Sequence, residues 1–193
     1  STSGFTTTGA SVMHHIESAP YDILLWRALT QWVGGMGIIL LVVAVLPFLG
    51  VGGLELFGAE ASGPTTDKIQ PRVTQTAKSL WLAYIVLTVL CILALALSGM
   101  PFFDAICHSF GAVATGGYST RNASIGAYGS PLYEWIIIIF MFLGGTSFVL
   151  HYQALRGSFR YLRDQQFRTY VGILLGACGL VLLLMGGLVM WES

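Results

Sequence analysis

Four long apolar stretches, separated by polar stretches, dominate the pattern of the chain. They lie at about 23–49, 79–100, 131–152 and 170–191. Each is long enough to cross a hydrocarbon core of about 30 Å, because such a crossing takes roughly 20 helical residues. Backbone polar groups must be satisfied inside lipid, and no alternation with a period of two favours a β-barrel. We therefore predict an all-α membrane protein with about four transmembrane helices.

A fifth apolar stretch, PFFDAICHSFGAVATGG at 101–117, is too short to span a bilayer and too apolar for an ordinary loop. Pro101 suits the first turn of a helix, and Asp104 would lie near its positive end, where a carboxylate is favoured. The glycines at 111, 116 and 117 would end the helix. The pattern therefore predicts a re-entrant half-helix followed by a loop.

Part of the sequence occurs twice. The segment SGFTTTGAS at 3–11 recurs as FGAVATGGYST at 110–120. The matched pairs within these loops are Gly4 with Gly111, and Thr8-Gly9 with Thr115-Gly116. The helix after each loop matches too, because WVGGMG at 32–37 corresponds to FLGGTS at 142–147. The repeat unit is therefore a helix, a re-entrant loop with Thr-Gly and a second helix, at a period of about 108 residues.

The repeat divides the chain into five parts. The loop and second helix of a first repeat occupy 1–50, a cytoplasmic connection follows at 51–78, and a complete second helix–loop–helix repeat occupies 79–152. A basic cytoplasmic connection at 153–169 leads to the first helix of a third repeat at 170–193. Parallel repeats, related by an axis along the membrane normal, place equivalent loops around one central pathway. This arrangement favours a pore lined by the re-entrant loops.

Composition strengthens the membrane assignment. Hydrophobic residues make up 55% of the chain and charged residues only 9%, with a mean hydropathy of +0.75. A soluble domain carries about 25% charged residues, so the bilayer must be the solvent of this chain. The formal net charge of zero offers no basic field for nucleic acid. We expect membrane lipid, and not nucleic acid, around the chain.

Basic residues predict the orientation in the membrane. The connection at 152–168 holds four arginines against one acid: Arg156, Arg160, Arg163 and Arg168 against Asp164. The positive-inside rule makes this connection cytoplasmic. Two helix crossings place an earlier basic connection on the same side, with Lys68, Arg72 and Lys78. The segments 1–22 and 101–130 would then face outward.

The Thr-Gly loops carry the chemistry that a cation pathway needs. A permeating cation must exchange its water shell for oxygen ligands, which in channel filters are chiefly backbone carbonyls. Glycine permits the backbone angles that this requires, and the carbonyl end of a short helix attracts cations. The candidate ligands are the backbone carbonyls of Thr7, Thr8, Gly9, Ala114, Thr115 and Gly116, with hydroxyl support from Thr8 and Thr115.

We expect the other polar and small residues in the apolar stretches to have structural roles rather than to bind an ion. Arg27, Gln31 and Glu134 lie near helix ends, where such side chains anchor or snorkel rather than line a pathway. The glycines at 34, 35, 37, 144 and 145 could form a gating hinge, but small residues in membrane helices usually let neighbouring backbones approach. The histidines at 14, 15 and 108 have no acidic or cysteine partner at ligand spacing, so we expect no metal site at them. We expect no bound cofactor.

The two loops resemble those of a known family. SGFTTTGAS at 3–11 and ATGGYST at 114–120 look like the first and second filter loops of TrkH-type potassium uptake proteins of the Trk/Ktr/HKT superfamily. The resemblance covers essentially the whole chain but only a middle part of a full subunit, which has further repeats. Since the chain begins inside a Thr/Gly-rich loop and ends just after an apolar run, we expect it to be an internal fragment.

The resemblance implies a function and a set of residues. It implies a potassium-channel-like fold in which Gly9 and Gly116, preceded by Thr8 and Thr115, form the potassium-binding filter. Proteins of this kind take up potassium, their substrate, across the bacterial inner (plasma) membrane as multi-pass homodimers and dock a cytosolic nucleotide-binding ring of the TrkA type. The stretch from Arg156 to Arg168 is a candidate contact with that ring, although positive-inside topology alone also explains it. Glycine in the loops favours potassium over sodium by family analogy.

Two other classes of function have weaker support. A secondary transporter with a midplane substrate site is the alternative that we keep, but it calls for inverted repeats, whereas these repeats are parallel. An intramembrane enzyme needs a positioned nucleophile or metal, such as Ser/His or paired Asp inside helices. The sequence contains no such set, so we predict that the chain is not an enzyme.

Overall fold

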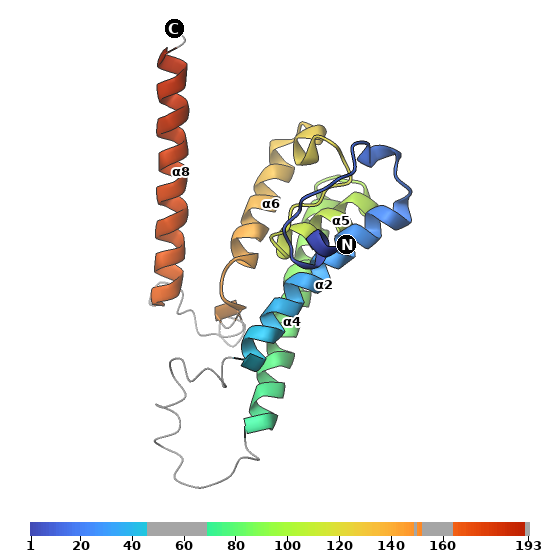
Figure 1. Ribbon diagram of the computed structural model, residues 1–193, viewed down its shortest axis with the longest axis vertical. Helices are drawn as coiled ribbons and strands as arrows, with labels where there is room; N and C mark the ends of the chain where they lie inside the picture. Colours follow the sequence, from blue (N-terminus) through green and yellow to red (C-terminus); the bar gives the residue numbers. More distant parts are fainter. Residues whose placement is uncertain (46–68, 149, 152–163, 192–193) are drawn as a thin grey trace. The chain divides into compact units, whose positions relative to one another are not determined.

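The computed structural model describes residues 1–45, 69–148, 150–151 and 164–191. All regular structure in these residues is helical, which confirms the all-α prediction (Figure 1). The chain divides into two compact units, Ser1–Phe148 and Val149–Ser193. The described residues of the first unit form α1 (Thr2–Phe5), α2 (Tyr21–Val45), α4 (Ile69–Leu97), α5 (Phe102–Val113) and α6 (Pro131–Gly144), together with the 3-10 helices η1 (Ile16–Ser18) and η4 (Ser124–Tyr128).

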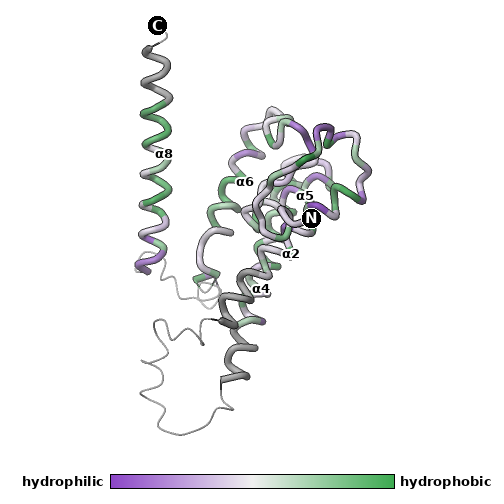
Figure 2. Tube along the Cα trace, in the orientation of Figure 1, coloured by the Kyte–Doolittle hydropathy of each residue, from purple (hydrophilic) through white to green (hydrophobic). Residues whose placement is uncertain are grey.

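The second unit contains the long helix α8 (Gln165–Trp191). Its first turn is capped by Asp164, whose Oδ1 accepts a hydrogen bond from the Phe167 N–H at 2.9 Å. Five consecutive apolar side chains at 180–184 are exposed within this unit, and Figure 2 shows apolar residues along the helix. A helix that is apolar on all sides needs apolar surroundings, which agrees with the span predicted at 170–191.

Within the part of the chain that the structure describes, two helical segments are long and apolar enough to cross a bilayer. They are Ala77–Leu97 of α4, with a mean hydropathy of 2.7, and Gln165–Leu184 of α8, with a mean hydropathy of 2.0. They overlap the spans predicted at 79–100 and 170–191. The 25-residue helix α2 contains most of the span predicted at 23–49. The count of four spanning helices stays a prediction.

The helix α5 lies at the centre of the first unit, in contact with α2, α4 and α6 (Figure 1). Polar contacts join these helices as well as apolar packing. Trp32 Nε1 donates to Thr88 Oγ1 at 3.0 Å, and the Tyr84 hydroxyl donates to the Trp32 backbone oxygen at 3.0 Å. The Trp32 ring stacks on Phe110 with the ring centroids 5.3 Å apart. These interhelical hydrogen bonds satisfy polar groups that lipid could not satisfy.

The short helix predicted from the stretch at 101–117 is present as α5. It begins after Pro101, carries Asp104 in its first turn and ends at Val113. At a rise of about 1.5 Å per residue, its 12 residues reach about 18 Å, too short to cross a bilayer. Most of its side chains are nevertheless buried, because neighbouring helices surround it.

The helix α6 ends at Gly144, and a turn follows. The prediction of an uninterrupted helix over 131–152 is therefore wrong. The break lies where the end of α5 approaches α6, since a Cβ on Gly144 would stand 2.5 Å from the Val113 oxygen. Just beyond the break, Thr146 Oγ1 donates to the Phe142 oxygen at 2.9 Å and satisfies a carbonyl at the helix end.

The two predicted cytoplasmic connections fall largely outside the described residues. Residues 46–68 and 152–163 lie outside them, and so do Arg156, Arg160 and Arg163. The helix α4 begins at Ile69, so the last part of the region predicted as a connection at 51–78 is helical. Pro71 fits this helix because proline is tolerated in a first turn, where its missing N–H is not needed.

Candidate functional site

The loop after α1 begins with a hydrogen-bonded helix end of the Schellman type. The Thr7 N–H donates to the Gly4 oxygen at 2.9 Å, and the Thr8 N–H donates to the Ser3 oxygen at 3.1 Å. These bonds satisfy two carbonyl groups that the end of a helix otherwise leaves free. The motif needs left-handed backbone at one residue, and here that residue is Thr7, with a φ of 53°.

The loop after α5 has the same construction. The Thr115 N–H donates to the Ala112 oxygen at 3.0 Å, and the Gly116 N–H donates to the Gly111 oxygen at 2.8 Å. The φ of Thr115 is 53°, as at Thr7. The donor and acceptor residues of these two bonds each lie 108 residues after their counterparts in the first loop. The two loops are therefore structural repeats.

Threonine is an unusual residue at the left-handed position. Positive φ values are uncommon outside glycine, and for a β-branched residue they are outliers. Such conformations cost about 1–3 kcal/mol each and concentrate at functional sites. The same outlier at Thr7 and Thr115 therefore marks the two loops as the candidate site.

The structure shifts the pairing of the two loops by one residue. A left-handed glycine follows two residues after each threonine: Gly9 has a φ of 75° and Gly117 a φ of 86°. Thr8 is therefore paired with Gly116, and Gly9 with Gly117. The pairings inferred from the sequence, Gly4 with Gly111 and Thr8-Gly9 with Thr115-Gly116, are therefore wrong by one residue, because identical residue types in two loops do not have to adopt the same backbone conformation.

The six predicted ligand residues lie at these two loop ends and differ in exposure. Thr8 and Thr115 are exposed. The half-buried residues are Thr7, Gly9 and Gly116. The sixth, Ala114, is 6% exposed and forms the C-cap of α5. The exposed Gly117 completes the second loop. The ligand role of all these carbonyls stays a prediction.

The two loops lie against each other. A Cβ on Gly9 would overlap the backbone oxygen of Gly116, so the two backbones are in direct contact. The Tyr118 hydroxyl donates to the Ala10 oxygen at 3.3 Å, and Ser3 Oγ donates to the same oxygen at 2.8 Å. Segments from two different repeats therefore form one joint site.

A glycine on the helix behind each loop allows the loop to approach closely. A Cβ on Gly34 of α2 would overlap the Phe5 oxygen, and a Cβ on Gly144 of α6 would overlap the Val113 oxygen. Phe5 and Val113 are counterparts in the two loops, so the same contact occurs in both repeats. This observation supports the packing interpretation of Gly34 and Gly144.

Gln31 on α2 lies behind the contact between the loops and is 0% exposed. Its Oε1 accepts a hydrogen bond from the Tyr118 N–H at 3.0 Å, while its Nε2 has no partner among the described residues. One turn earlier, the Arg27 guanidinium lies 4.4 Å from the centroid of the Tyr118 ring and donates to Ser11 Oγ at 3.0 Å. The snorkelling interpretation of Gln31 and Arg27 is therefore wrong, since both side chains turn toward the loops.

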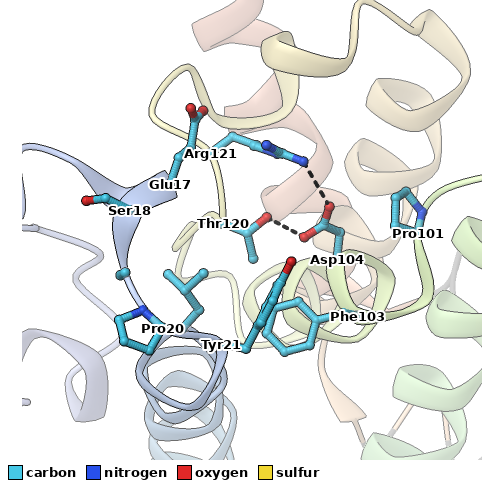
Figure 3. Close-up of a pocket in the computed structure, with 11 residues that line it drawn as sticks. Glu17, Ser18, Pro20, Tyr21, Pro101, Phe103, Asp104, Thr120 and Arg121 are labelled. Atoms are coloured by element: carbon cyan, nitrogen blue, oxygen red, sulfur yellow. Dashed lines mark hydrogen bonds and ion pairs between the residues drawn. The ribbon is translucent and has the colours of Figure 1, made fainter.

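A pocket of about 450 Å³ lies between the residues before α2 and the start of α5 (Figure 3). The Asp104 carboxylate on its wall accepts a hydrogen bond from Thr120 Oγ1 at 2.8 Å and lies 3.7 Å from Arg121 Nη2. The Tyr128 hydroxyl lies 3.4 Å from Thr120 Oγ1, and burial raises the pKa of Tyr128, so this phenol stays protonated at neutral pH. The Asp104 charge therefore has partners, and the cluster ties the segment after Gly117 to α5.

Comparison with known proteins identifies the family. The sequence profile of the family described as "TrkH: Cation transport protein" matches residues 1–192. The chain belongs to the TrkH family. This finding confirms the resemblance inferred from the loop residues. The family is one of membrane transport proteins rather than enzymes, as the sequence predicts.

Several TrkH-family relatives are similar over nearly the whole chain. The Trk system potassium uptake protein TrkH of Salmonella typhimurium is 50% identical over 186 residues, 93% of this chain and 38% of the relative. The Trk system potassium uptake protein TrkI of Halomonas elongata is 42% identical over 194 residues, 100% of this chain and 38% of the relative. The crystal structure of the potassium transporter TrkH from Vibrio parahaemolyticus is similar at a TM-score of 0.76 and 40% identity, over 90% of this chain and 35% of that one. The chain therefore spans 38% of the length of these two curated relatives.

The sequence alone did not indicate three residues of this candidate site: Gln31, Gly117 and Tyr118. The signal for Gln31 was its position four residues after Arg27 in an otherwise apolar stretch, which places both on one helix face. Gly117 was not predicted, because the comparison of the two loops matched Gly9 with Gly116, the first of two consecutive glycines. Tyr118 gave no signal, because its contact with Ala10 joins residues 108 positions apart.

Proposed function

We propose that this TrkH-family chain forms part of the potassium pathway of a multi-pass protein of the bacterial inner (plasma) membrane. The observation that carries the proposal is the left-handed threonine loop, which occurs twice with one backbone conformation and with both copies in contact. Backbone carbonyls in such loops are the oxygen ligands that replace the water shell of a permeating cation. The named relatives are Trk system potassium uptake proteins, which supports potassium as the ion.

The re-entrant pore loop belongs to this proposal. The helix α5 is too short to span and ends at the second loop, so its carbonyl end, with roughly half a negative charge, lies next to the proposed pathway. This end attracts a cation without a carboxylate in the pore. The proposed ligands are the carbonyls of Thr7, Thr8, Gly9, Ala114, Thr115 and Gly116, and the structural pairing adds Gly117.

The proposed partners follow from the family resemblance. We expect the full-length subunit to form a homodimer and to dock a cytosolic nucleotide-binding ring of the TrkA type. The candidate contact runs from Arg156 to Arg168, of which Arg168 lies in the first turn of α8. Replacing the arginines with glutamine in the full-length protein should weaken copurification of the ring. Unchanged copurification would leave membrane topology as the reason for these charges.

The alternative function, a secondary transporter with a midplane substrate site, has less support. Such a site is built between inverted repeats from interrupted spanning helices. The two loops here share one backbone conformation and meet at Gly9 and Gly116. This arrangement favours equivalent loops around a common pathway.

Potassium-dependent growth tests the proposal. An uptake-deficient bacterium would carry the full-length parent gene, either as wild type or with Gly9→Ala. We expect growth at low potassium to be lost in the variant, because a Cβ on Gly9 would overlap the Gly116 oxygen and its φ of 75° disfavours any side chain. Gly126→Ala is the control, since no described atom lies within 4 Å of a Cβ at that position. Normal growth with Gly9→Ala, at equal amounts of protein in the membrane, would contradict the pathway.

A further inference from the structure

Gln31 lies behind the contact between the two loops, with its carboxamide bonded to the second loop and close to the first. A Cβ added to Gly111 would lie 3.4 Å from Gln31 Oε1, and one added to Gly116 would lie 2.5 Å from Gln31 Cδ. A Cβ added to Gly9 would lie 3.7 Å from Gln31 Nε2. The side chain is completely buried at this point, and it accepts the Tyr118 N–H. The second repeat therefore rests on a side chain that belongs to the first.

Gly116 is glycine for a different reason from Gly9 and Gly117. The φ values of Gly9 and Gly117, 75° and 86°, disfavour a side chain, whereas Gly116 does not adopt the left-handed region. A side chain at Gly116 is instead excluded by Gln31, because a Cβ would lie 2.5 to 2.7 Å from three atoms of the carboxamide. Gln31 and Gly116 are therefore complementary in size.

The loop motif itself does not require glycine at these positions. The counterparts of Gly111 and Gly116 in the first loop are Ser3 and Thr8, which make the same backbone hydrogen bond at 3.1 Å. Both carry side chains without disturbing the motif. The glycine at 116 is therefore explained by the neighbouring Gln31 and not by the turn, whereas a Cβ on Gly111 would lie nearest the Tyr118 backbone oxygen, at 3.2 Å.

The helix–loop–helix repeat does not require glutamine either. Gln31 directly precedes Trp32, and Met141 directly precedes the matching Phe142. A thioether has about the length of the glutamine side chain but cannot donate a hydrogen bond and accepts one only weakly. The glutamine is thus specific to the contact between the first and second loops, which makes Met141 a matched control position.

We propose that Gln31 is a positioning residue that determines ion selectivity, an inference that rests on the proposed function. By accepting the Tyr118 N–H and filling the space beside Gly111 and Gly116, the carboxamide holds the second loop at a fixed distance from the first. This distance sets the spacing of the carbonyl oxygens that an ion meets. Selectivity in a carbonyl filter depends on that spacing and on how firmly it is kept.

Selectivity measurements on the full-length protein test the role of Gln31. The ratio of potassium to sodium permeability would be measured for Gln31→Met and Gln31→Asn, with Met141→Leu as the control. We expect the ratio to fall roughly three- to tenfold in both Gln31 variants, the change that follows from losing one hydrogen bond. A purely structural role would lower the amount of folded protein and leave the ratio unchanged. An unchanged ratio in the folded protein would overturn the proposal.

A double-substitution experiment tests the proposal in a second way. We expect Gly116→Ala to lower potassium uptake in the wild-type background and to have little further effect together with Gln31→Ser, which removes the atoms that the new methyl group would meet. Gly117→Ala should be equally harmful in both backgrounds, because its strain comes from φ. Equal harm from Gly116→Ala in both backgrounds would contradict the inference.

The same set of variants separates this inference from the proposed function. If Gly9→Ala abolishes potassium uptake while the Gln31 variants keep the wild-type permeability ratio, the inference about Gln31 is wrong and the pathway stands. If Gly9→Ala keeps wild-type uptake and selectivity, the proposed pathway is wrong.

Discussion

The loop after α1 and the loop after α5 share one backbone conformation but are supported in different ways. The first loop uses its own hydroxyl groups. Ser3 Oγ donates to the Ala10 oxygen, and Thr6 Oγ1 lies 2.8 Å from Thr8 Oγ1. These bonds lie near the surface, and α1 has only four residues. These hydroxyl bonds are local in the sequence, whereas the bonds from Arg27 to Ser11 and from Tyr118 to Ala10 reach the first loop from other segments.

The second loop depends on residues far away in the sequence. It follows the buried helix α5, and Gln31 of the first repeat lies behind it. Asp104 and Thr120 tie the segment beyond it to the start of α5. Two different sets of side chains thus accompany the same backbone hydrogen bonds and the same left-handed threonine in both loops. This difference teaches that the repeat preserves the backbone, which is what a carbonyl filter requires.

The largest expected effect in this comparison comes from the glycines behind the loops. Gly34→Ala and Gly144→Ala would each place a methyl group against a loop carbonyl, and backbone cannot move aside as a flexible side chain can. Overpacking of this kind typically costs about 1–3 kcal/mol. We expect both variants of the full-length protein to unfold at lower temperature and to lose uptake.

Gly37→Ala is the matched control for these variants, because it lies on the same helix as Gly34 and no described atom is within 4 Å of a Cβ there. Thermal unfolding and potassium uptake would be measured for all three. If Gly34→Ala behaved like Gly37→Ala, the close approach of the first loop to α2 would be wrong.

A smaller effect is expected at the left-handed glycine of the second loop. Gly117→Ala meets no described atom within 4 Å, so its cost is the backbone strain alone, about 1–2 kcal/mol. Gly9→Ala adds an overlap with the Gly116 oxygen to the same strain. We therefore expect Gly117→Ala to slow potassium uptake and Gly9→Ala to abolish it. Equal losses of potassium uptake in the two variants would show that the contact between Gly9 and Gly116 adds nothing to the effect of backbone strain.

The two threonines test whether backbone strain itself serves the site. Thr7→Gly and Thr115→Gly should relieve a left-handed conformation that is costly for a β-branched residue, and so raise stability by about 1 kcal/mol. The same changes should lower the potassium-to-sodium permeability ratio, because glycine lets the loop relax. Thermal unfolding and permeability ratios would be measured together. Stability gained without any loss of selectivity would mean that the strain has no role in ion choice.

Much of the fold could be predicted from the sequence because long apolar runs have few possible structures. The span Ala77–Leu97 and the short helix α5 follow from length and composition alone. The end of α6 at Gly144 could not be predicted in this way. Gly34 and Gly144 each approach a backbone oxygen of another segment, yet α2 continues past Gly34 and α6 ends at Gly144, so glycine alone does not distinguish a packed helix from a broken one.

The candidate site was predicted as a pair of loops but not in its register or its supports. Thr-Gly occurs in both loops, yet the left-handed residues are Thr7 and Gly9 in one and Thr115 and Gly117 in the other. The residue types alone do not show which residues adopt a positive φ. Gln31 was given a surface role, because a lone polar residue in an apolar stretch reveals its burial only when the facing segment is known.

The smallest expected effect concerns the hydroxyl groups of the first loop. Thr6 Oγ1 bonds to the Thr2 oxygen at 3.1 Å and to Thr8 Oγ1 at 2.8 Å, whereas its counterpart in the second loop, Ala114, has no hydroxyl. Thr6→Val keeps the shape and removes both bonds, so we expect a loss of about 0.5–1.5 kcal/mol in stability. Thr6→Ser, which keeps the hydroxyl, should unfold at nearly the wild-type temperature. If the valine and serine variants unfold at the same temperature, the first loop does not depend on its own hydroxyls. Gln31 then remains as the feature that distinguishes the two loops.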